Sequence, residues 1–408
     1  MKKISGSQQN KEIKENVSRK KRKIKIPIND VKSNKKEIIA HFEKKQIRHK
    51  ILRTTRTPSG QVLDWIDINS QVDGKIATPP PEPELLGLVR GKYKHTLTKF
   101  ELDDPDVERG PAGTVPILRK DLKHISFKKP LRRFLSKSGR KTYPLRISEQ
   151  DEVEMPVDGG HDYAYTSQFV DCFGGESNLS AYDPYTNWSD EFSLLQIAMA
   201  RGSGKQKQTV EGGWQEYKDH YGDWVPHLFV YYTTNGYSND DDNQGGYNRD
   251  VDGWVQYSDS VYPGAVSSPN STRGGAQFIM QIKYQLWQGN WWFCCNGKWL
   301  GYYPGNLFNA SGLQNKAEKM ALYGEIVDSG DHSGETNTDM GSGYWPEWRW
   351  PYSGYISNAR YQSGAQGQMT DYNGTSWASD PDMYDLETHM LSGSSWGSYF
   401  WLGGPGAG

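Results

Sequence analysis

Residues 161–408 alternate apolar and polar side chains over short stretches that are separated by Gly, Asn and Asp turns. Because successive side chains of a β-strand point to opposite faces, this alternation predicts strands that are buried on one face. Repeated strands at this spacing predict two packed antiparallel sheets, an all-β sandwich of jelly-roll type. The predicted strands lie within residues 192–200, 209–217, 227–234, 276–286, 291–303, 320–327 and 397–402.

The first half of the chain has a different pattern, which mixes helical and extended stretches. Apolar residues recur at a helical spacing over residues 35–53 and predict a short amphipathic helix. Strand-like stretches on both sides of a turn at residues 58–60 predict a β-hairpin, and residues 110–120 predict a turn followed by a short strand. We therefore expect a small mixed α+β unit in this half.

Composition divides the chain into three parts. Residues 1–34 are rich in lysine and predict a basic disordered tail. The run P-P-P-E-P-E at residues 79–84 predicts a stiff linker, and the Gly and Pro residues between 132 and 160 mark an exposed boundary. The expected parts are the tail (1–34), the α+β unit with its Pro-rich linker (35–150) and the β domain (151–408).

Charge is unevenly distributed although the formal net charge is only -1. The first 60 residues hold about 19 Lys and Arg against about five Asp and Glu, so the remainder is acidic. The basic run at residues 19–25 could contact nucleic acid or a membrane surface, but lysine tracts in polar tails are more often solvated arms. No apolar run approaches the roughly 18 residues that span a bilayer. We expect a soluble protein that binds neither nucleic acid nor membranes.

The three cysteines, Cys172, Cys294 and Cys295, are too few for a disulfide framework. A bond between Cys172 and either of the others is open, and so are three free thiols, whereas the vicinal pair cannot easily bridge to itself. No catalytic-cysteine or zinc pattern surrounds them. The acidic loop at residues 239–253 begins like a calcium loop but has Val251 where a bidentate glutamate is needed, so we expect no metal and no cofactor.

Two glutamates stand in the middle of predicted strands. Glu211 lies in T-V-E-G-G-W-Q-E-Y and Glu325 in A-L-Y-G-E-I-V-D. Strand alternation places Gln215 on the face of Glu211 and Tyr323 on the face of Glu325. The two glycines after Glu211 would let another backbone come close, which suits a surface that receives an extended ligand. A glutamate on an open strand face is usually only solvated, so these residues alone leave the function open.

Further motifs follow one another in a fixed order over residues 161–408. They are H-D-Y-A (161–164), E-F-S-L-L-Q-I (191–197), V-E-G-G-W-Q (210–215), W-W-F (291–293), L-G-Y-Y-P (300–304), Y-G-E-I-V (323–327), M-G-S-G (340–343) and G-G-P-G (403–406). In this order the second half resembles the neprosin domain, a family of glutamic peptidases. R-T-P-S-G-Q-V-L-D-W-I-D-I (56–68) and G-P-A-G-T-V-P-I (110–117) resemble the activation peptide of that family.

The resemblance implies a zymogen, with an antiparallel β-sandwich (jelly-roll or concanavalin-like) peptidase domain behind a small mixed α+β pro-domain. The implied activity is a glutamic endopeptidase that cleaves after proline at acid pH. The catalytic glutamates of the family match Glu211 and Glu325, while Gln215 and Tyr323 are candidates for binding the substrate or the developing oxyanion. The implied partners are a proline-containing peptide or protein and the pro-domain itself, as an intramolecular inhibitor.

The chemistry of such a dyad follows from two close carboxyls, which share one proton because both cannot easily ionise. The ionised partner, for which Glu211 is our choice, activates water, and the protonated partner donates to the carbonyl oxygen and then to the leaving amine. We also expect self-processing between about Arg140 and His161, at Pro144 or Pro156. The family is typically secreted, so an extracellular location is implied, although no signal peptide is visible at Met1.

One departure and two alternatives accompany this interpretation. Plant members have cysteines in the segment that matches residues 239–253, and this chain has none there. Paired glutamates beside aromatic residues would also suit a glycoside hydrolase on a similar sandwich. A non-catalytic carbohydrate-binding sandwich, in which the glutamates are incidental, is the other alternative.

Overall fold

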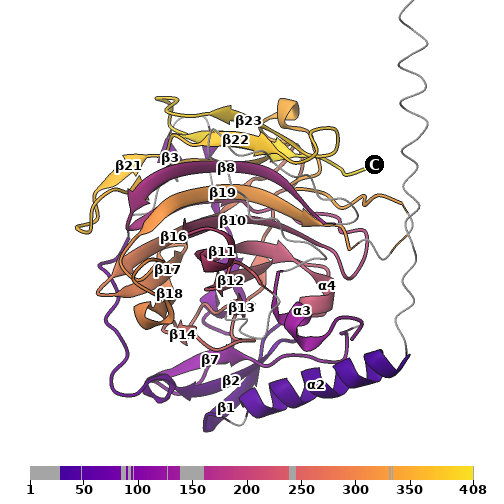
Figure 1. Ribbon diagram of the computed structural model, residues 1–408, viewed down its shortest axis with the longest axis vertical. Coiled ribbons are helices and arrows are strands. Elements are labelled where there is room, and N and C mark those ends of the chain that lie inside the picture. The colour runs from indigo at the N-terminus through magenta and orange to yellow at the C-terminus, as the bar shows by residue number, and fades with distance from the viewer. Residues whose placement is uncertain are drawn as a thin grey trace, which may run out of the picture.

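The main body of the protein is a sandwich of two antiparallel sheets (Figure 1). The computed structural model describes residues 28–46, 48–83, 89–90, 93–94, 96–125, 127–137, 160–238, 245–329, 332 and 334–407. The predicted antiparallel β-sandwich is thereby confirmed.

The first sheet has seven strands in the order β13-β12-β11-β10-β19-β8-β22, all paired antiparallel. Its long central strands run as adjacent arcs across the middle of the molecule (Figure 1). Strand β10 separates β11 from β19, so the stretches that contain Glu211 and Glu325 are one strand apart. The strands are β8 (His161–Cys172), β10 (Phe192–Arg201), β11 (Gln208–Glu216), β12 (His227–Thr233), β13 (Gly245–Tyr247), β19 (Ala317–Val327) and β22 (Thr375–Ala378).

The second sheet follows the order β14-β18-β17-β16-β9-β20-β24-β23, with β21 beside β20 and β5 beside β16. The segment 291–303, predicted as one stretch, forms two strands joined at Asn296 and Gly297. Both residues have positive φ, 49° and 79°, which is the type I′ turn that an Asn-Gly pair favours. The strands are β5 (Thr96–Leu97), β9 (Gly174–Ser180), β14 (Val255–Gln256), β16 (Phe278–Trp287), β17 (Asn290–Cys295), β18 (Lys298–Pro304), β20 (Gly354–Gln362), β21 (Met369–Asp371), β23 (Asp385–His389) and β24 (Tyr399–Gly403).

The main hydrophobic core lies between the two sheets. On β10, Leu195 and Ile197 point into this core, and they meet Tyr284 and Phe293 of the opposite sheet. Strand alternation then turns Gln196 to the other face of the seven-stranded sheet. Each fully buried side chain of this kind contributes about 1.5–3 kcal/mol through removal of apolar surface from water.

The glycine pair after Glu211 allows other parts of the protein to come close, and at Gly213 the predicted close approach of another backbone is that of β10. A Cβ on Gly212 would lie 2.8 Å from the ring of Phe293, in the core. A Cβ on Gly213 would lie 2.0 Å from the carbonyl oxygen of Leu195 on the neighbouring strand. Close approach of other parts of the protein therefore requires glycine at both positions.

The first half of the chain packs against one edge of the sandwich (Figure 1). Helix α2 (Ile28–Gln46) is followed by a three-stranded sheet of order β1-β2-β7. The predicted hairpin and the predicted short strand are present in this sheet. Its elements are β1 (Ile51–Arg56), β2 (Val62–Asp67) and β7 (Thr114–Leu118), followed by helix α3 (Leu131–Leu135).

The predicted helix over residues 35–53 was placed too late in the chain. Helix α2 begins at Ile28, inside the segment expected to be a tail, and ends at Gln46. Ile51, which fits the helical spacing, instead enters β1 and pairs with Ile66. Residues 1–27 of the predicted tail lie outside the described residues.

Two short strands of the first half are integrated into the sandwich. Strand β5 runs parallel beside β16, and β6 (Lys99–Phe100) pairs with β15 (Ser267–Ser268). Trp65 and Leu102 belong to the same hydrophobic cluster as the sandwich core. The remaining elements are β3 (Val89–Arg90), β4 (Tyr93–Lys94), α4 (Lys218–Tyr221) and the 3-10 helices Ile68–Gln71, Glu101–Asp103, Gly204–Gln206, Gly305–Leu307 and Pro346–Trp348.

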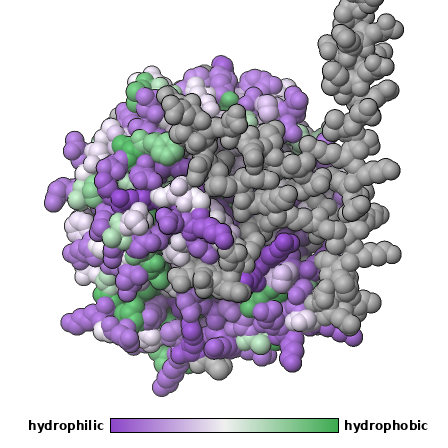
Figure 2. Space-filling view, viewed as in Figure 1, coloured by the Kyte–Doolittle hydropathy of each residue, from purple (hydrophilic) through white to green (hydrophobic). Residues whose placement is uncertain are grey.

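The three cysteines are buried free thiols, which settles the alternative left open by the sequence. Burial raises the pKa of Cys172 and of Cys294 to about 12. On the face shown in Figure 2, hydrophilic residues predominate and the hydrophobic ones form small separate groups. Among the described helices, none has the length and apolar character needed to cross a membrane.

Candidate active site

Glu211 and Glu325 both lie on the face of the seven-stranded sheet that is turned away from the core. Their neighbours in sequence, Val210 and Ile326, point into the core, so alternation sends the two glutamates to the opposite side. Both are buried, with 0% and 2% of their surface exposed. The structure brings them to one pocket, which Tyr323 also lines.

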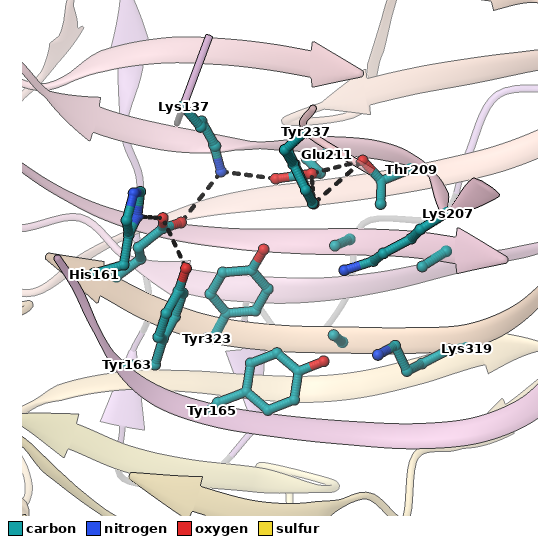
Figure 3. A pocket seen from close by; sticks show the side chains of 14 residues that line it. Lys137, His161, Tyr163, Tyr165, Lys207, Thr209, Glu211, Tyr237, Lys319 and Tyr323 are labelled. Atoms are coloured by element: carbon teal, nitrogen blue, oxygen red, sulfur yellow. Dashed lines mark hydrogen bonds and ion pairs between the residues drawn. The ribbon is translucent and has the colours of Figure 1, made fainter. Parts of the chain in front are cut away.

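The side chain of Lys137 lies between the two glutamates (Figure 3). Its Nζ is 2.7 Å from Oε2 of Glu211 and 3.3 Å from Oε2 of Glu325, and it also donates to Oε1 of Gln196. Lys137 follows helix α3 by two residues and is itself 5% exposed. One nitrogen within hydrogen-bonding distance of both groups shows how close the two carboxylates are.

Glu211 accepts hydrogen bonds at both of its carboxylate oxygens. Thr209 donates to Oε1 over 2.7 Å, Tyr237 donates to the same oxygen over 2.5 Å, and Gln196 donates to Oε2 over 2.9 Å. Burial by itself would raise the pKa of this carboxyl. The charge and hydrogen bond of Lys137, with the two hydroxyl donors, outweigh burial and lower its pKa to about 2.

Glu325 is held by a different set of neighbours from β8. Its Oε1 contacts Nδ1 of His161 and accepts a hydrogen bond from the Tyr163 hydroxyl over 3.3 Å. Burial raises the pKa of this carboxyl, but Lys137 and then His161 outweigh it, so the pKa lies below its usual value. The surroundings of both glutamates therefore favour the ionised carboxylate.

The two predicted binding residues are placed differently. The ring of Tyr323 lines the pocket and packs against Tyr165, with 5.0 Å between ring centroids. Gln215 is buried on the face of Glu211, but it is not among the residues that line the pocket. Its Nε2 donates to the hydroxyl of Tyr247 over 3.2 Å. Gln215 thus supports the surrounding face, whereas Tyr323 reaches the glutamates' pocket.

Sequence reasoning missed several residues of this site. Gln196 and Thr209 could have been found, because both occupy predicted strands at positions that share the face of Glu211. Lys137 gave no local signal, since its contacts span 74 and 188 positions of the chain. The other missed residues are His161, Tyr163, Lys207, Tyr237 and Lys319.

The free space in the pocket is about 30 Å³, which holds one or two water molecules. The Lys137 side chain lines this pocket and contacts both glutamates. Nowhere in the described ranges do three or more His, Cys, Asp or Glu residues form a group that could hold a metal ion. The residues that began the calcium-like loop, 239–244, lie outside the described residues.

A protein-family model described as Neprosin matches residues 189–405, more than half of the chain. The chain belongs to the Neprosin family. The matched segment contains both Glu211 and Glu325, and membership supports a glutamic peptidase.

Solved structures with some similarity to this Neprosin-family chain include two peptidases and a transglycosylase. Scytalido-glutamic peptidase with a transition state analog inhibitor is 9% identical, with a TM-score of 0.31 over 60% of this chain and 98% of that chain. SCP-B, an Eqolisin-family peptidase in complex with the tripeptide Ala-Ile-His, is 7% identical, with a TM-score of 0.28 over 60% and 99%. The apo Crh5 transglycosylase is 11% identical, with a TM-score of 0.25 over 42% and 60%. TM-scores this low do not establish a shared fold, so the family assignment rests on the match to the Neprosin model.

Proposed function

We propose that this chain is the zymogen of a glutamic endopeptidase that acts at acid pH through Glu211 and Glu325. The observation that carries the proposal is the single ammonium group of Lys137 within reach of both buried carboxylates. The apolar core of this sandwich lies between the sheets, and glutamates are rarely buried, so two buried glutamates on the outer face call for a functional explanation. A shared catalytic proton supplies one.

When Lys137 leaves, the two carboxylates face each other without the ammonium group that joined them, and His161 remains in contact with Glu325 alone. Like charges this close raise one pKa, so the pair holds one proton between them at acid pH. The hydroxyl donors Thr209 and Tyr237 and the amide of Gln196 favour the ionised form of Glu211. Glu211 is therefore assigned as the base that takes a proton from the attacking water.

Glu325 then carries the shared proton and acts as the general acid. It donates this proton to the oxygen of the scissile carbonyl. As the tetrahedral intermediate collapses, Glu211 passes the proton that it took from water to the leaving amine, and Glu325 takes a proton back from the hydroxyl of the intermediate. Water adds across the C–N bond, so no covalent enzyme intermediate forms. The amide of Gln196 and the hydroxyl of Tyr163, which already donate to the dyad, are placed to bind the developing oxyanion.

Preference for proline belongs to this proposal and is supported by the apolar lining of the pocket. The rings of Tyr165 and Tyr323 form one buried cluster with Ala198 and Ala321. Two aromatic walls over small side chains suit a compact, flat ring such as that of proline. The cluster lies on strands β8, β10 and β19, directly beside the two glutamates.

The first half of the chain is proposed as the activation peptide and internal inhibitor, with boundaries at residues 35–150 and the peptidase at 151–408. Lys137 is the inhibitory group, because it occupies the position between the two carboxylates. The expected self-processing sites, Pro144 and Pro156, lie outside the described residues. An extracellular location, expected from the family, is part of the same proposal.

The test is hydrolysis of a peptide with one internal proline, measured at pH 3–7 with the full-length chain and with Glu211→Gln and Glu325→Gln. Loss of cleavage in both variants, with cleavage retained in Glu318→Gln, is the expected result. Glu318 is a matched control, because it lies on the same strand as Glu325 and its side chain is 45% exposed. Cleavage of a β-glucan in place of the peptide, abolished by the same substitutions, would instead identify a glycoside hydrolase.

A further inference from the structure

The pocket of the two glutamates continues to a basic end formed by Lys207 and Lys319 (Figure 3). Lys207 directly precedes β11, four residues before Glu211, and Lys319 lies on β19, six residues before Glu325. Both lysines are buried, with 8% and 6% of their surface exposed. The basic end is thus part of the same cavity and the same sheet face as the proposed dyad.

Aromatic rings hold the two ammonium groups at this end. Nζ of Lys207 lies 5.1 Å from the ring centroid of Tyr237, and Nζ of Lys319 lies 5.0 Å from that of Phe169. Between the strands that carry the lysines lies Ala200, which pairs with Lys319 and whose short side chain leaves the pocket open. Cation–π contacts position an ammonium group, but they leave its charge in place.

Two buried cations at one end of a pocket disfavour each other. Burial, followed by the charge of Lys319, lowers the pKa of Lys207 to about 8. Burial also lowers the pKa of Lys319 to about 8, while Glu318 opposes this shift from the next position of the strand. At the other end of the same pocket, Glu211 and Glu325 both contact Lys137. An anionic group that entered here would relieve the repulsion and gain charge-assisted hydrogen bonds.

Building on the proposed peptidase function, we propose that Lys207 and Lys319 form a subsite for a carboxylate of the peptide substrate. This carboxylate is either an Asp or Glu side chain or the C-terminal carboxylate. Lys207 and Glu211 are four positions apart, or about 13 Å along an extended backbone, and the long side chains shorten this distance. An extended peptide covers it in about two to four residues, so the acidic group lies that far from the scissile bond.

The test uses peptides with one cleavable bond and an amidated C-terminus, in which a single Glu occupies each position from four before to four after that bond. Each peptide has a Gln counterpart. For the full-length chain after acid incubation, assayed near pH 5.5, we expect kcat/KM at one position to be about tenfold higher with Glu than with Gln. A second pair, without internal acids, compares a free C-terminal carboxylate with an amide and so separates the two sources of the group.

The Glu-to-Gln ratio is then measured in the double variant Lys207→Gln with Lys319→Gln. We expect the ratio to fall to about one, and to be kept when both lysines are replaced by arginine. Lys316→Gln is the control and keeps the ratio, because Lys316 is a partly exposed lysine next to β19 that pairs with Asp171. An unchanged ratio in the double Gln variant, or no preference for a carboxylate at any position, would overturn the subsite.

Failure of the proposed function would be seen separately. If the full-length chain cleaves no peptide, binding of the same fluorescently labelled peptides is measured by polarisation. Tighter binding of a Glu peptide than of its Gln counterpart, lost in the double Gln variant, would support the subsite without the peptidase. Equal binding of all peptides would overturn the subsite as well. Melting temperatures of all variants show whether each is folded.

Discussion

Nζ of Lys137 lies 2.7 Å from Oε2 of Glu211, and both side chains are almost fully buried. Breaking a buried ion pair by removing one partner is strongly destabilising, because the other charge is left without compensation. We predict that Lys137→Gln lowers the free energy of unfolding at pH 7 by about 2–4 kcal/mol. At the same time, the full-length variant should hydrolyse peptides without any cut in the chain.

Urea unfolding and a peptide assay with intact-mass analysis measure these two effects. Lys128→Gln is the matched control, because Lys128 is an exposed lysine of the same segment. It should change neither quantity. A Lys137→Gln chain that is folded, uncut and inactive at every pH would contradict the inhibitory role of this lysine.

The ion pair also predicts how stability depends on pH. The pKa of Glu211 in the folded chain is about 2, below the ordinary value of about 4.3. A carboxyl whose pKa is lowered by folding stabilises the folded chain at any pH above its ordinary pKa. This stability is lost as the pH falls from about 5 to about 2. A shift of this size corresponds to an amount on the order of 3 kcal/mol.

In Lys137→Gln the pH dependence of stability reverses in sign. One of the two facing carboxylates then has a raised pKa, so its protonation at low pH stabilises the folded chain. The melting temperature of the parent chain should therefore exceed that of Lys137→Gln at pH 7, and the difference should shrink or reverse near pH 3. Differential scanning calorimetry of both chains between pH 3 and 7 measures this. A difference that stays constant with pH would show that the ion pair does not set the titration of Glu211.

Substitution of the dyad should affect the reaction rate far more than substrate affinity. Removing a general acid or base typically costs 10²–10⁴ in rate, so we predict a loss of about 10³ in kcat for Glu211→Gln and for Glu325→Gln. The double variant should be about as inactive as each single variant, because groups that act as a unit are not additive. Single-turnover kinetics measure this, and a full multiplicative loss in the double variant would argue for independent roles.

The hydroxyl of Tyr237 should tune the base. It donates to Oε1 of Glu211, and a hydrogen bond to a charged group contributes about 1.5–3 kcal/mol. Without it, the ionised form of Glu211 is less favoured and its pKa rises. Tyr237→Phe should therefore shift the acid limb of the kcat profile upward by about one pH unit. Tyr232→Phe is the control, because the Tyr232 hydroxyl donates to the backbone of Asp252 on the other side of the sheet. This substitution should leave the acid limb of the kcat profile unchanged.

The two glycines beside Glu211 should differ in their tolerance of a methyl group. A Cβ at Gly213 meets the carbonyl oxygen of Leu195 at 2.0 Å, and this backbone cannot move without disturbing the pairing of β10 with β11. Gly213→Ala should destabilise the chain by more than about 2 kcal/mol. Gly212→Ala meets the ring of Phe293, a side chain that can shift, and should cost less. Urea unfolding of both variants compares them.

Local pattern was enough to predict four strands of each sheet of the sandwich and the outward direction of Glu211 and Glu325, but it missed the long strands β8, β9 and β20. The meeting of the two glutamates depends on β10 lying between β11 and β19, which is a non-local pairing that alternation does not encode. Lys137 is a single lysine after the short helix α3, and lysines are usually solvated. Only the folded chain shows that it is buried between two carboxylates. The split of residues 291–303 was readable, because Asn296–Gly297 is a strong hairpin signal.

The pairing of β5 with β16 and of β6 with β15 has a consequence for the proposed maturation. Cleavage of the chain after Lys137 would leave the N-terminal fragment bound to the C-terminal fragment. The backbone hydrogen bonds of β5 and β6 hold it, and so do Trp65 and Leu102 in the common core. Cleavage of the chain and release of the N-terminal fragment are thus separate events. The cleaved fragment would stay bound non-covalently until β5 and β6 dissociate from their partner strands. Their dissociation exposes an edge of β16 in the released enzyme, which must remain exposed or be covered by another segment.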